Sequence, residues 1–132
     1  KPVTDQPSEK FNAGMAMRRK VLGDEYVDRS LANMNEFSRD LQTIITEHAW
    51  GDIWTREGLE LKQRSLINIA LLSALNRPHE LELHLRGAIN NGCTPVEIRE
   101  ALLQTAVYAG LPSGLDSFRV ARRVFEEMGN DL

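Results

Sequence analysis

Apolar side chains recur every three to four residues along most of this 132-residue chain, which is the spacing of helices that bury one face. No stretch shows the sustained alternation of apolar and polar residues that a half-buried strand requires. A chain of this length can form one modest core but not two. We therefore predict a single all-α domain over residues 1–132, with about six helices joined by short loops.

The first half of the chain is expected to contain two helices and a connector. One helix is predicted over residues 8–23. A second helix, capped at its start by Asp28 or Ser30, is predicted to continue to His48. Residues 50–58 break the apolar period, so we predict a connector there, with its two tryptophans as aromatic anchors.

Four helices are predicted in the second half. Residues 61–75 are apolar nearly all round, so this helix is expected to be central and buried. Pro78 opens a helix that continues to about Asn91. The helix over residues 94–109 starts with Thr-Pro-Val-Glu, which is a capping box with proline in the first turn. After a turn, the last helix is predicted over residues 115–128.

The composition excludes several classes of function. With 42% hydrophobic and 27% charged residues, the chain is in the range of globular proteins rather than disordered ones. Its net charge of −3 argues against a general attraction to nucleic acid or to an anionic membrane. No apolar run approaches the ~20 residues of a membrane span. Residues 1–7 are predicted to be a flexible leader that lacks the apolar core of a signal peptide, so we expect a soluble cytoplasmic protein.

Cysteine and histidine usage limits redox and metal chemistry. The single cysteine, Cys93, cannot form an internal disulfide, a C-x-x-C pair or a thiolate zinc site, so we interpret it as a structural thiol. The three histidines lack the paired spacing of known metal-binding motifs, so we predict no metal site.

His84 is the most informative residue for function. It lies beside the apolar stripe of its helix, where a histidine usually packs in a core or an interface. Glu80, four residues earlier, can lie beside the imidazole, orient it and raise its pKa. Asn91, seven residues later, falls on the same side. The pattern leaves both interpretations open, a packing histidine and an acid–base group.

Arg64 and two polar neighbours, Ser65 and Asn68, interrupt the most apolar helix on one side. A buried arginine is costly unless it is paired. Its partner is either a nearby acid, such as Glu60, Glu97 or Glu100, or the carboxylate of a substrate. Both alternatives stay open.

Three aromatic residues could line a pocket for a small ring. Aromatic residues in a small helical protein more often simply pack, and we favour that interpretation for Trp50 and Trp54. Tyr108 is more open, because its hydroxyl lies near a helix end at Gly110.

Seven strings, taken together in their order and spacing, resemble the carboxymuconolactone decarboxylase family, and the resemblance covers nearly the whole chain from Phe11 to Glu127. The strings are Arg18–Asp24, Val27–Ser30, Trp50–Trp54, Arg64–Leu66, His84–Gly92, Glu97–Glu100 and Tyr108–Pro112.

The wider superfamily includes alkylhydroperoxidase D, which uses a C-x-x-C-x-x-x-H motif and an upstream glutamate. His84 matches the histidine of that motif, but Arg77 and Glu80 stand at the two cysteine positions and Ser65 at the glutamate position. Peroxide reduction needs a thiolate and a resolving partner, so a peroxidase activity is not expected.

The resemblance implies an alkylhydroperoxidase D-like helical bundle that forms a homo-oligomer, commonly a hexamer, and works without a cofactor. It implies decarboxylation of a small anionic lactone, 4-carboxymuconolactone, to 3-oxoadipate enol-lactone in the protocatechuate branch of the β-ketoadipate pathway. The alternatives are a related decarboxylase or lactone-processing enzyme that acts on another small carboxylated substrate, and a non-enzymatic oligomeric binding protein.

The residues then receive expected roles in that reaction. His84 is expected to deliver a proton, oriented by Glu80, and Arg64 to anchor a substrate carboxylate. The remaining expected substrate contacts are Arg29, Arg77, Tyr108, Asn91 and Trp54. The donor to the developing oxyanion is expected to be Tyr108, Asn91 or a backbone N–H, and the sequence does not choose among them.

Overall fold

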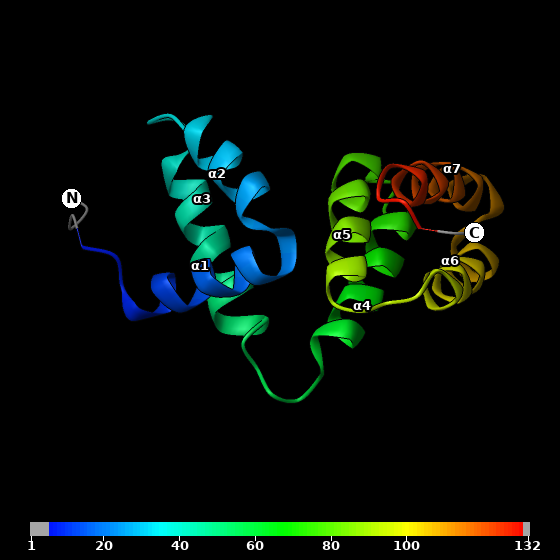
Figure 1. Ribbon diagram of the computed structural model, residues 1–132, viewed down its shortest axis with the longest axis horizontal. Coiled ribbons are helices and arrows are strands. Elements are labelled where there is room, and N and C mark those ends of the chain that lie inside the picture. The colour runs from blue at the N-terminus through cyan, green and yellow to red at the C-terminus, as the bar shows by residue number, and fades with distance from the viewer. Residues whose placement is uncertain (1–5, 131–132) are drawn as a thin grey trace. The chain divides into compact units, whose positions relative to one another are not determined.

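The computed structural model describes residues 6–130, and this range is helical without a strand (Figure 1). Seven α-helices and one π-helical segment occur in it, so the all-α prediction is confirmed with one more α-helix than the six expected. The chain divides into two compact units, Lys1–Leu59 and Glu60–Leu132, and each is described by itself. That they form one domain stays a prediction. Most of the predicted leader lies outside the described residues.

None of the helices in residues 6–130 is long and apolar enough to cross a membrane.

The first unit is built on the contact between its first and last helices. Helix α1 begins because Ser8 Oγ accepts a hydrogen bond from the Phe11 amide, and it ends at Gly23, whose φ is 90°. The elements of this unit are α1 (Glu9–Leu22), α2 (Asp24–Ala32), α3 (Arg39–Ile44) and the π-helix η1 (Ile45–Ile53).

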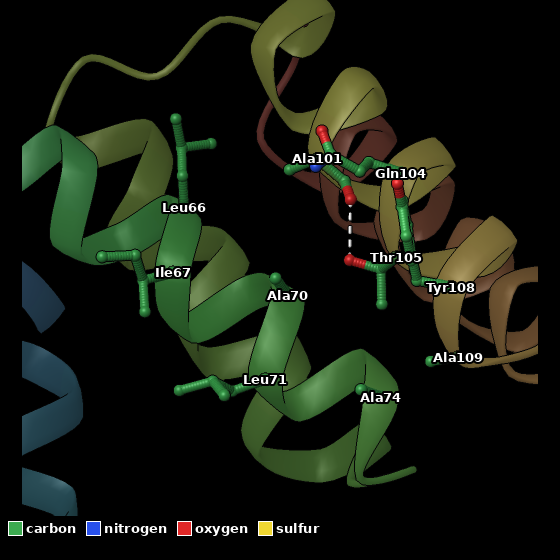
Figure 2. Close-up of a pocket in the computed structure, with 10 residues that line it drawn as sticks. All are labelled: Leu66, Ile67, Ala70, Leu71, Ala74, Ala101, Gln104, Thr105, Tyr108 and Ala109. Carbon is green, nitrogen blue, oxygen red and sulfur yellow. Dashed lines mark hydrogen bonds between the residues drawn. The ribbon is translucent and has the colours of Figure 1, made fainter.

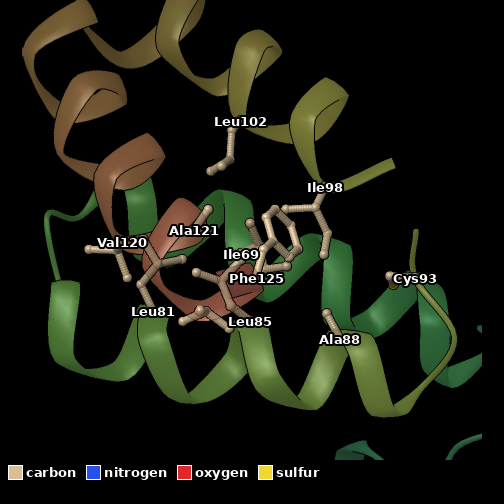
Figure 3. Packing of buried hydrophobic residues seen from close by; sticks show 11 residues of the cluster. Ile69, Leu81, Leu85, Ala88, Cys93, Ile98, Leu102, Val120, Ala121 and Phe125 are labelled. Carbon is tan, nitrogen blue, oxygen red and sulfur yellow. The ribbon is translucent and has the colours of Figure 1, made fainter. Parts of the chain in front are cut away.

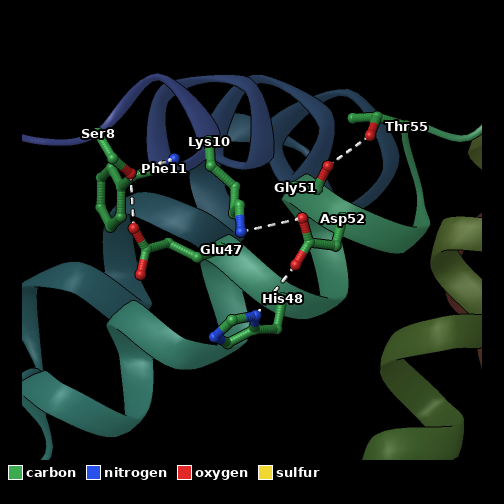
Figure 4. Close-up of polar contacts among 8 residues, drawn as sticks. All are labelled: Ser8, Lys10, Phe11, Glu47, His48, Gly51, Asp52 and Thr55. Carbon is green, nitrogen blue, oxygen red and sulfur yellow. Dashed lines mark hydrogen bonds and ion pairs between the residues drawn. The ribbon is translucent and has the colours of Figure 1, made fainter.

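Two glycines allow α1 and η1 to approach closely. A Cβ atom at Gly14 would lie 2.0 Å from the Thr46 carbonyl oxygen, and one at Gly51 would lie 2.6 Å from the Lys10 carbonyl oxygen. Both clashes are with backbone, which cannot move aside easily. Figure 4 shows side chains that join the two helices, including the ion pair of Lys10 with Asp52, 3.2 Å long.

The prediction of one long helix up to His48, followed by a connector, is wrong. Residues 33–38 interrupt the helix, because Asn35 and Ser38 exchange side chain-to-backbone hydrogen bonds of 3.1 Å that compete with the helical pattern. Part of the expected connector is helical, since η1 continues to Ile53. The tryptophan anchors are confirmed: Trp50 and Trp54 are buried, with ring centroids 4.8 Å apart.

The second unit is a four-helix arrangement around one apolar core (Figures 1 and 3). Pro78 stands in the first turn of the second of these helices, and Thr94 and Glu97 form the predicted capping box of the third. The helices are α4 (Leu61–Ala74), α5 (Pro78–Asn90), α6 (Pro95–Ala109) and α7 (Leu111–Glu127). The core includes Ile69, Leu81, Leu85, Ala88, Ile98, Leu102, Val124 and Phe125.

Two expectations for this unit are wrong. Helix α4 is not buried all round, because Ile67, Leu71 and Leu75 are exposed. The last helix starts at Leu111 instead of residue 115, since Pro112 occupies the first turn, where no backbone N–H is needed.

Candidate active site

A polar seam runs between α4 and α5 in the second unit. Asn91, the C-cap residue of α5, donates from Nδ2 to Ser65 Oγ at 2.9 Å and to the Leu61 carbonyl oxygen at 3.5 Å. One to two turns away, Asn68 Nδ2 lies 3.4 Å from His84 Nδ1. These contacts define the α4–α5 seam, whose residues are Ser65, Asn68, His84 and Asn91, with Arg64 one turn before Asn68 on the same face of α4.

Helical spacing explains why these side chains meet. Leu81, Leu85 and Ala88 are buried in the core, which fixes the rotation of α5 and leaves His84 half-buried beside them. On α4, Ser65 is fully buried, and Asn68 follows it by one turn. The seam is therefore a direct result of how α4 and α5 bury their apolar faces.

The electrostatics of His84 differ from the sequence-based expectation. Burial lowers the pKa of His84 to about 4, and the charge of Glu80 opposes this only in part. The prediction that a carboxylate partner raises the pKa is therefore wrong in its net direction. Glu80 is exposed, so water screens its charge, whereas the imidazole itself loses water. His84 is neutral at pH 7.

The contact with Asn68 favours one of the two tautomers of the neutral ring. The Nδ2 atom of an asparagine only donates hydrogen bonds, so His84 Nδ1 accepts in this pair. This arrangement favours the tautomer whose ring proton lies on Nε2. The seam thus holds a neutral imidazole whose Nε2–H can donate to an oxygen atom.

The two arginines and the glutamate predicted in this unit occupy different places along the helices. Arg64 is half-buried on α4, one turn before Asn68. Arg77 precedes α5 as its N-cap residue and is exposed, as is Glu80 in the first turn. Of these three, Arg64 is the one that lies beside the seam.

Tyr108 lies in another part of the second unit. It is 85% exposed and lines a groove of about 520 Å³ between α4 and α6, which we call the α4–α6 groove (Figure 2). The groove shares no lining residue with the seam. Its lining holds no charged side chain and consists of Leu66, Ile67, Ala70, Leu71, Ala74, Ala101, Gln104, Thr105, Tyr108 and Ala109.

Arg29 and Trp54, the other two predicted substrate contacts, belong to the first unit. Arg29 is exposed and forms an ion pair of 3.6 Å with Glu25 on its own helix. Trp54 packs against Trp50. Both residues therefore belong to a different compact unit from His84.

Cys93 has the features of a structural thiol. It is buried, its Sγ lies 3.5 Å from the Lys62 carbonyl oxygen, and burial raises the pKa of the thiol to about 11. At neutral pH the sulfur is therefore protonated, which makes it a poor nucleophile.

The sequence placed Asn68 in a polar cluster but gave it no role, and it overlooked Arg18, which is buried in the first unit. The signal for Asn68 was present, because a polar residue one turn from Ser65 shares its face. Its pairing with His84 depends on the register of two helices, which the pattern within either helix does not contain.

Comparison with known proteins places the chain in a family. A sequence profile of the carboxymuconolactone decarboxylase family matches residues 39–123. A 4-carboxymuconolactone decarboxylase of Acinetobacter baylyi is 43% identical over 92% of this chain and 90% of its own length. A nitrosuccinic acid decarboxylase of Metarhizium robertsii is 48% identical over 89% of this chain and 82% of its own length. A 4-carboxymuconolactone decarboxylase of Pseudomonas putida is 50% identical over 33% of this chain and 92% of its own length.

An all-α chain with relatives of this kind over most of its length is an enzyme of the carboxy-lyase class. It belongs to the carboxymuconolactone decarboxylase family.

Proposed function

We propose that this enzyme decarboxylates 4-carboxymuconolactone to 3-oxoadipate enol-lactone, without a cofactor, in the protocatechuate branch of the β-ketoadipate pathway and in the cytoplasm. The observation that carries the proposal is the similarity to the Acinetobacter enzyme along nine-tenths of both chains. The neutral, half-buried His84 in the α4–α5 seam also supports the proposal, because it can donate a hydrogen bond to a substrate oxygen.

The substrate itself can accept the electrons released by the reaction. Its ring carboxylate is vinylogous to the lactone carbonyl, so the pair from the broken C–COO⁻ bond moves through the ring double bond to the carbonyl oxygen. CO₂ leaves, and an aromatic furan oxide forms. Protonation of that intermediate at carbon gives the enol-lactone. The protein has to hold two carboxylates, stabilise one developing oxyanion and allow protonation.

His84 fits the second of these tasks best. A neutral imidazole with its proton on Nε2 is a weak acid, but it is a good hydrogen-bond donor to an oxyanion. We therefore propose that His84 stabilises the furan oxide, a role different from the proton delivery expected from the sequence. A single donor of this type contributes ~10²–10³-fold to the rate.

Arg64 is our proposed anchor for a substrate carboxylate. It lies beside the seam, one turn from Asn68, and its planar guanidinium can bind a carboxylate through two hydrogen bonds. Arg77, at the start of α5, is proposed as the second anchor. An anchor raises kcat only where it binds the transition state more tightly than the substrate.

A homo-oligomer, a hexamer by the family resemblance, is part of the proposal. The α4–α6 groove and its surroundings expose large apolar side chains, and surfaces of this kind in soluble proteins are usually covered by a partner. The groove has no charged lining residue, so it is unsuited to a doubly anionic lactone. We propose that another copy of the chain covers it.

The test is CO₂ release from 4-carboxymuconolactone by the purified protein without added cofactor. We expect release well above the spontaneous rate, and a loss of ~10²–10³-fold in kcat for His84→Asn. His48→Asn is the matched control, because His48 is exposed on η1 and pairs with Asp52. A folded wild-type protein that releases no CO₂ would contradict the proposed substrate, and an active His84→Asn variant would contradict the role of His84.

The similarity to the nitrosuccinic acid decarboxylase supports a second candidate, nitrosuccinate. That compound makes the same demands on a site. It carries two carboxylates, and its nitro group can take up the electrons as CO₂ leaves, giving an anion with charge on oxygen. Parallel assays with the two compounds decide between them by the ratio of their kcat/KM values.

A further inference from the structure

Arg18 is a buried cation that has no acidic partner within residues 6–130. Its side chain is 4% exposed on α1. The guanidinium donates from Nη1 to Gln42 Oε1 at 3.1 Å and from Nη2 to Ser30 Oγ at 3.2 Å, and Tyr26 contributes a further polar contact. Within residues 6–130 its Nε donates to no acceptor. All three contacts are neutral groups.

The neighbouring residue shows the contrast. Arg19, on the same helix, is half-buried and forms ion pairs with Asp24 at 3.1 Å and Asp28 at 2.9 Å. Within the described part of the chain, the more buried arginine is therefore the one that has no carboxylate partner. Burying a charge is costly unless an opposite charge compensates it, so Arg18 is poised to bind an anion.

A groove of about 500 Å³ in the first unit adjoins this cation. Gln42 lines the groove and also accepts the hydrogen bond from Arg18, so its amide NH₂ is the group left to bind a ligand. Met15, one turn before Arg18, lines the groove too. So does Leu31, which directly follows Ser30.

The lining combines an apolar wall with a second cation. Phe11, Met15 and Leu31 supply apolar surface, and Arg39 supplies a positive charge. The one acidic lining residue, Glu47, accepts a hydrogen bond of 2.6 Å from Ser8 Oγ (Figure 4). The groove is thus suited to a small molecule with an apolar body and a carboxylate.

We propose that the groove of the first unit binds a small amphipathic carboxylate. Its apolar part packs on Phe11 and Met15, and its carboxylate is held by Gln42 and Arg39 with Arg18 as the buried countercharge. This site goes beyond the proposed function, because it uses none of the α4–α5 seam. The carboxylate comes either from the substrate or from a separate effector, and the experiment distinguishes the two.

Benzoate is the probe, and benzamide is its uncharged match in shape. The protein is titrated with each compound at constant ionic strength. The melting temperature is followed by calorimetry and the Arg18 Nε–H resonance by NMR. We expect benzoate to raise the melting temperature saturably and to shift that resonance, while benzamide does neither. Equal effects of the two compounds, or no effect of benzoate, would overturn the proposal.

Variants at adjacent positions sharpen the test. Arg18→Met keeps the length of the side chain and removes its charge, and we expect it to weaken benzoate binding about tenfold or more. Arg19→Met removes a guanidinium that already has two carboxylate partners, so binding should persist. If Arg18→Met does not fold, Arg39→Ala replaces it. Unchanged benzoate binding in the folded variant, Arg18→Met or its replacement Arg39→Ala, would refute the proposed site.

Kinetics identify the source of the carboxylate. If the groove takes the substrate, benzoate competes and raises KM. If the groove takes an effector, benzoate changes kcat without competing with the substrate. Because benzoate binding is measured without turnover, failure of the proposed reaction and failure of this site give different results.

Discussion

At the scale of the residue, His84 couples the chemistry of the seam to the stability of the protein. Its pKa falls from an ordinary 6.5 to about 4 because the charged ring would lose water on folding. Between these two values the unfolded chain binds the proton and the folded protein does not. The folded state therefore loses stability as pH falls from 6.5 towards 4, and this contribution is fully present above 6.5.

The prediction is a His84-dependent loss of stability in mild acid. The free energy of unfolding of the wild type should fall by about 1.4 kcal/mol per pH unit from this one group. His84→Asn should remove that part of the slope. Urea unfolding at several pH values between 4 and 7 measures it, with His48→Asn as the control because His48 is exposed. Equal slopes in wild type and His84→Asn would show that the ring is not held neutral.

Sequence patterns predicted the site only as far as one helix reaches. Glu80, His84 and Asn91 were placed on one side of α5 because helical spacing is known in advance. The bonds Asn68–His84 and Asn91–Ser65 cross between helices, so they depend on how the core sets the register of α4 against α5. The direction of the pKa shift of His84 was mispredicted for the same reason, because the burial that lowers this pKa depends on how the helices pack.

At the scale of the element, helix starts that depend on local sequence were predicted correctly, whereas features that depend on packing between helices were not. The capping box of Thr94 and Glu97 and the proline start of α5 depend only on neighbouring residues. The π-helix η1 was missed, and its contact with α1 depends on two glycines far apart in the sequence, Gly14 and Gly51.

The second prediction concerns Gly14. In an exposed helix, a change from glycine to alanine usually stabilises by reducing the freedom of the unfolded chain. Here the added Cβ would lie 2.0 Å from the Thr46 carbonyl oxygen, so Gly14→Ala should destabilise by about 1–3 kcal/mol or more. Gly58→Ala is the matched control, because no atom lies within 4 Å of its added Cβ. Chemical unfolding of both variants checks the difference, and a stabilised Gly14→Ala would contradict the close α1–η1 contact.

At the scale of the whole molecule, the exposed apolar surface bears on assembly. The prediction that α4 would be buried failed because its neighbours within the second unit cover only part of it. Leu71 on α4 is 52% exposed and Tyr108 on α6 is 85% exposed, and both line the uncharged groove. Covering such a surface with a partner removes apolar side chains from water, which lowers the free energy of the assembly. A second copy of the chain is the partner that we propose.

The last prediction follows from this surface. Leu71→Glu places a charge in the α4–α6 groove, and burying that charge against an apolar partner would be costly, so the oligomer should dissociate into smaller species. Phe37→Glu is the control, because Phe37 is 97% exposed in the first unit and lies outside the groove. Sedimentation equilibrium of the wild type and both variants measures the mass. If Leu71→Glu keeps the wild-type mass while remaining folded, the copies associate through a different face, and the groove then has another occupant.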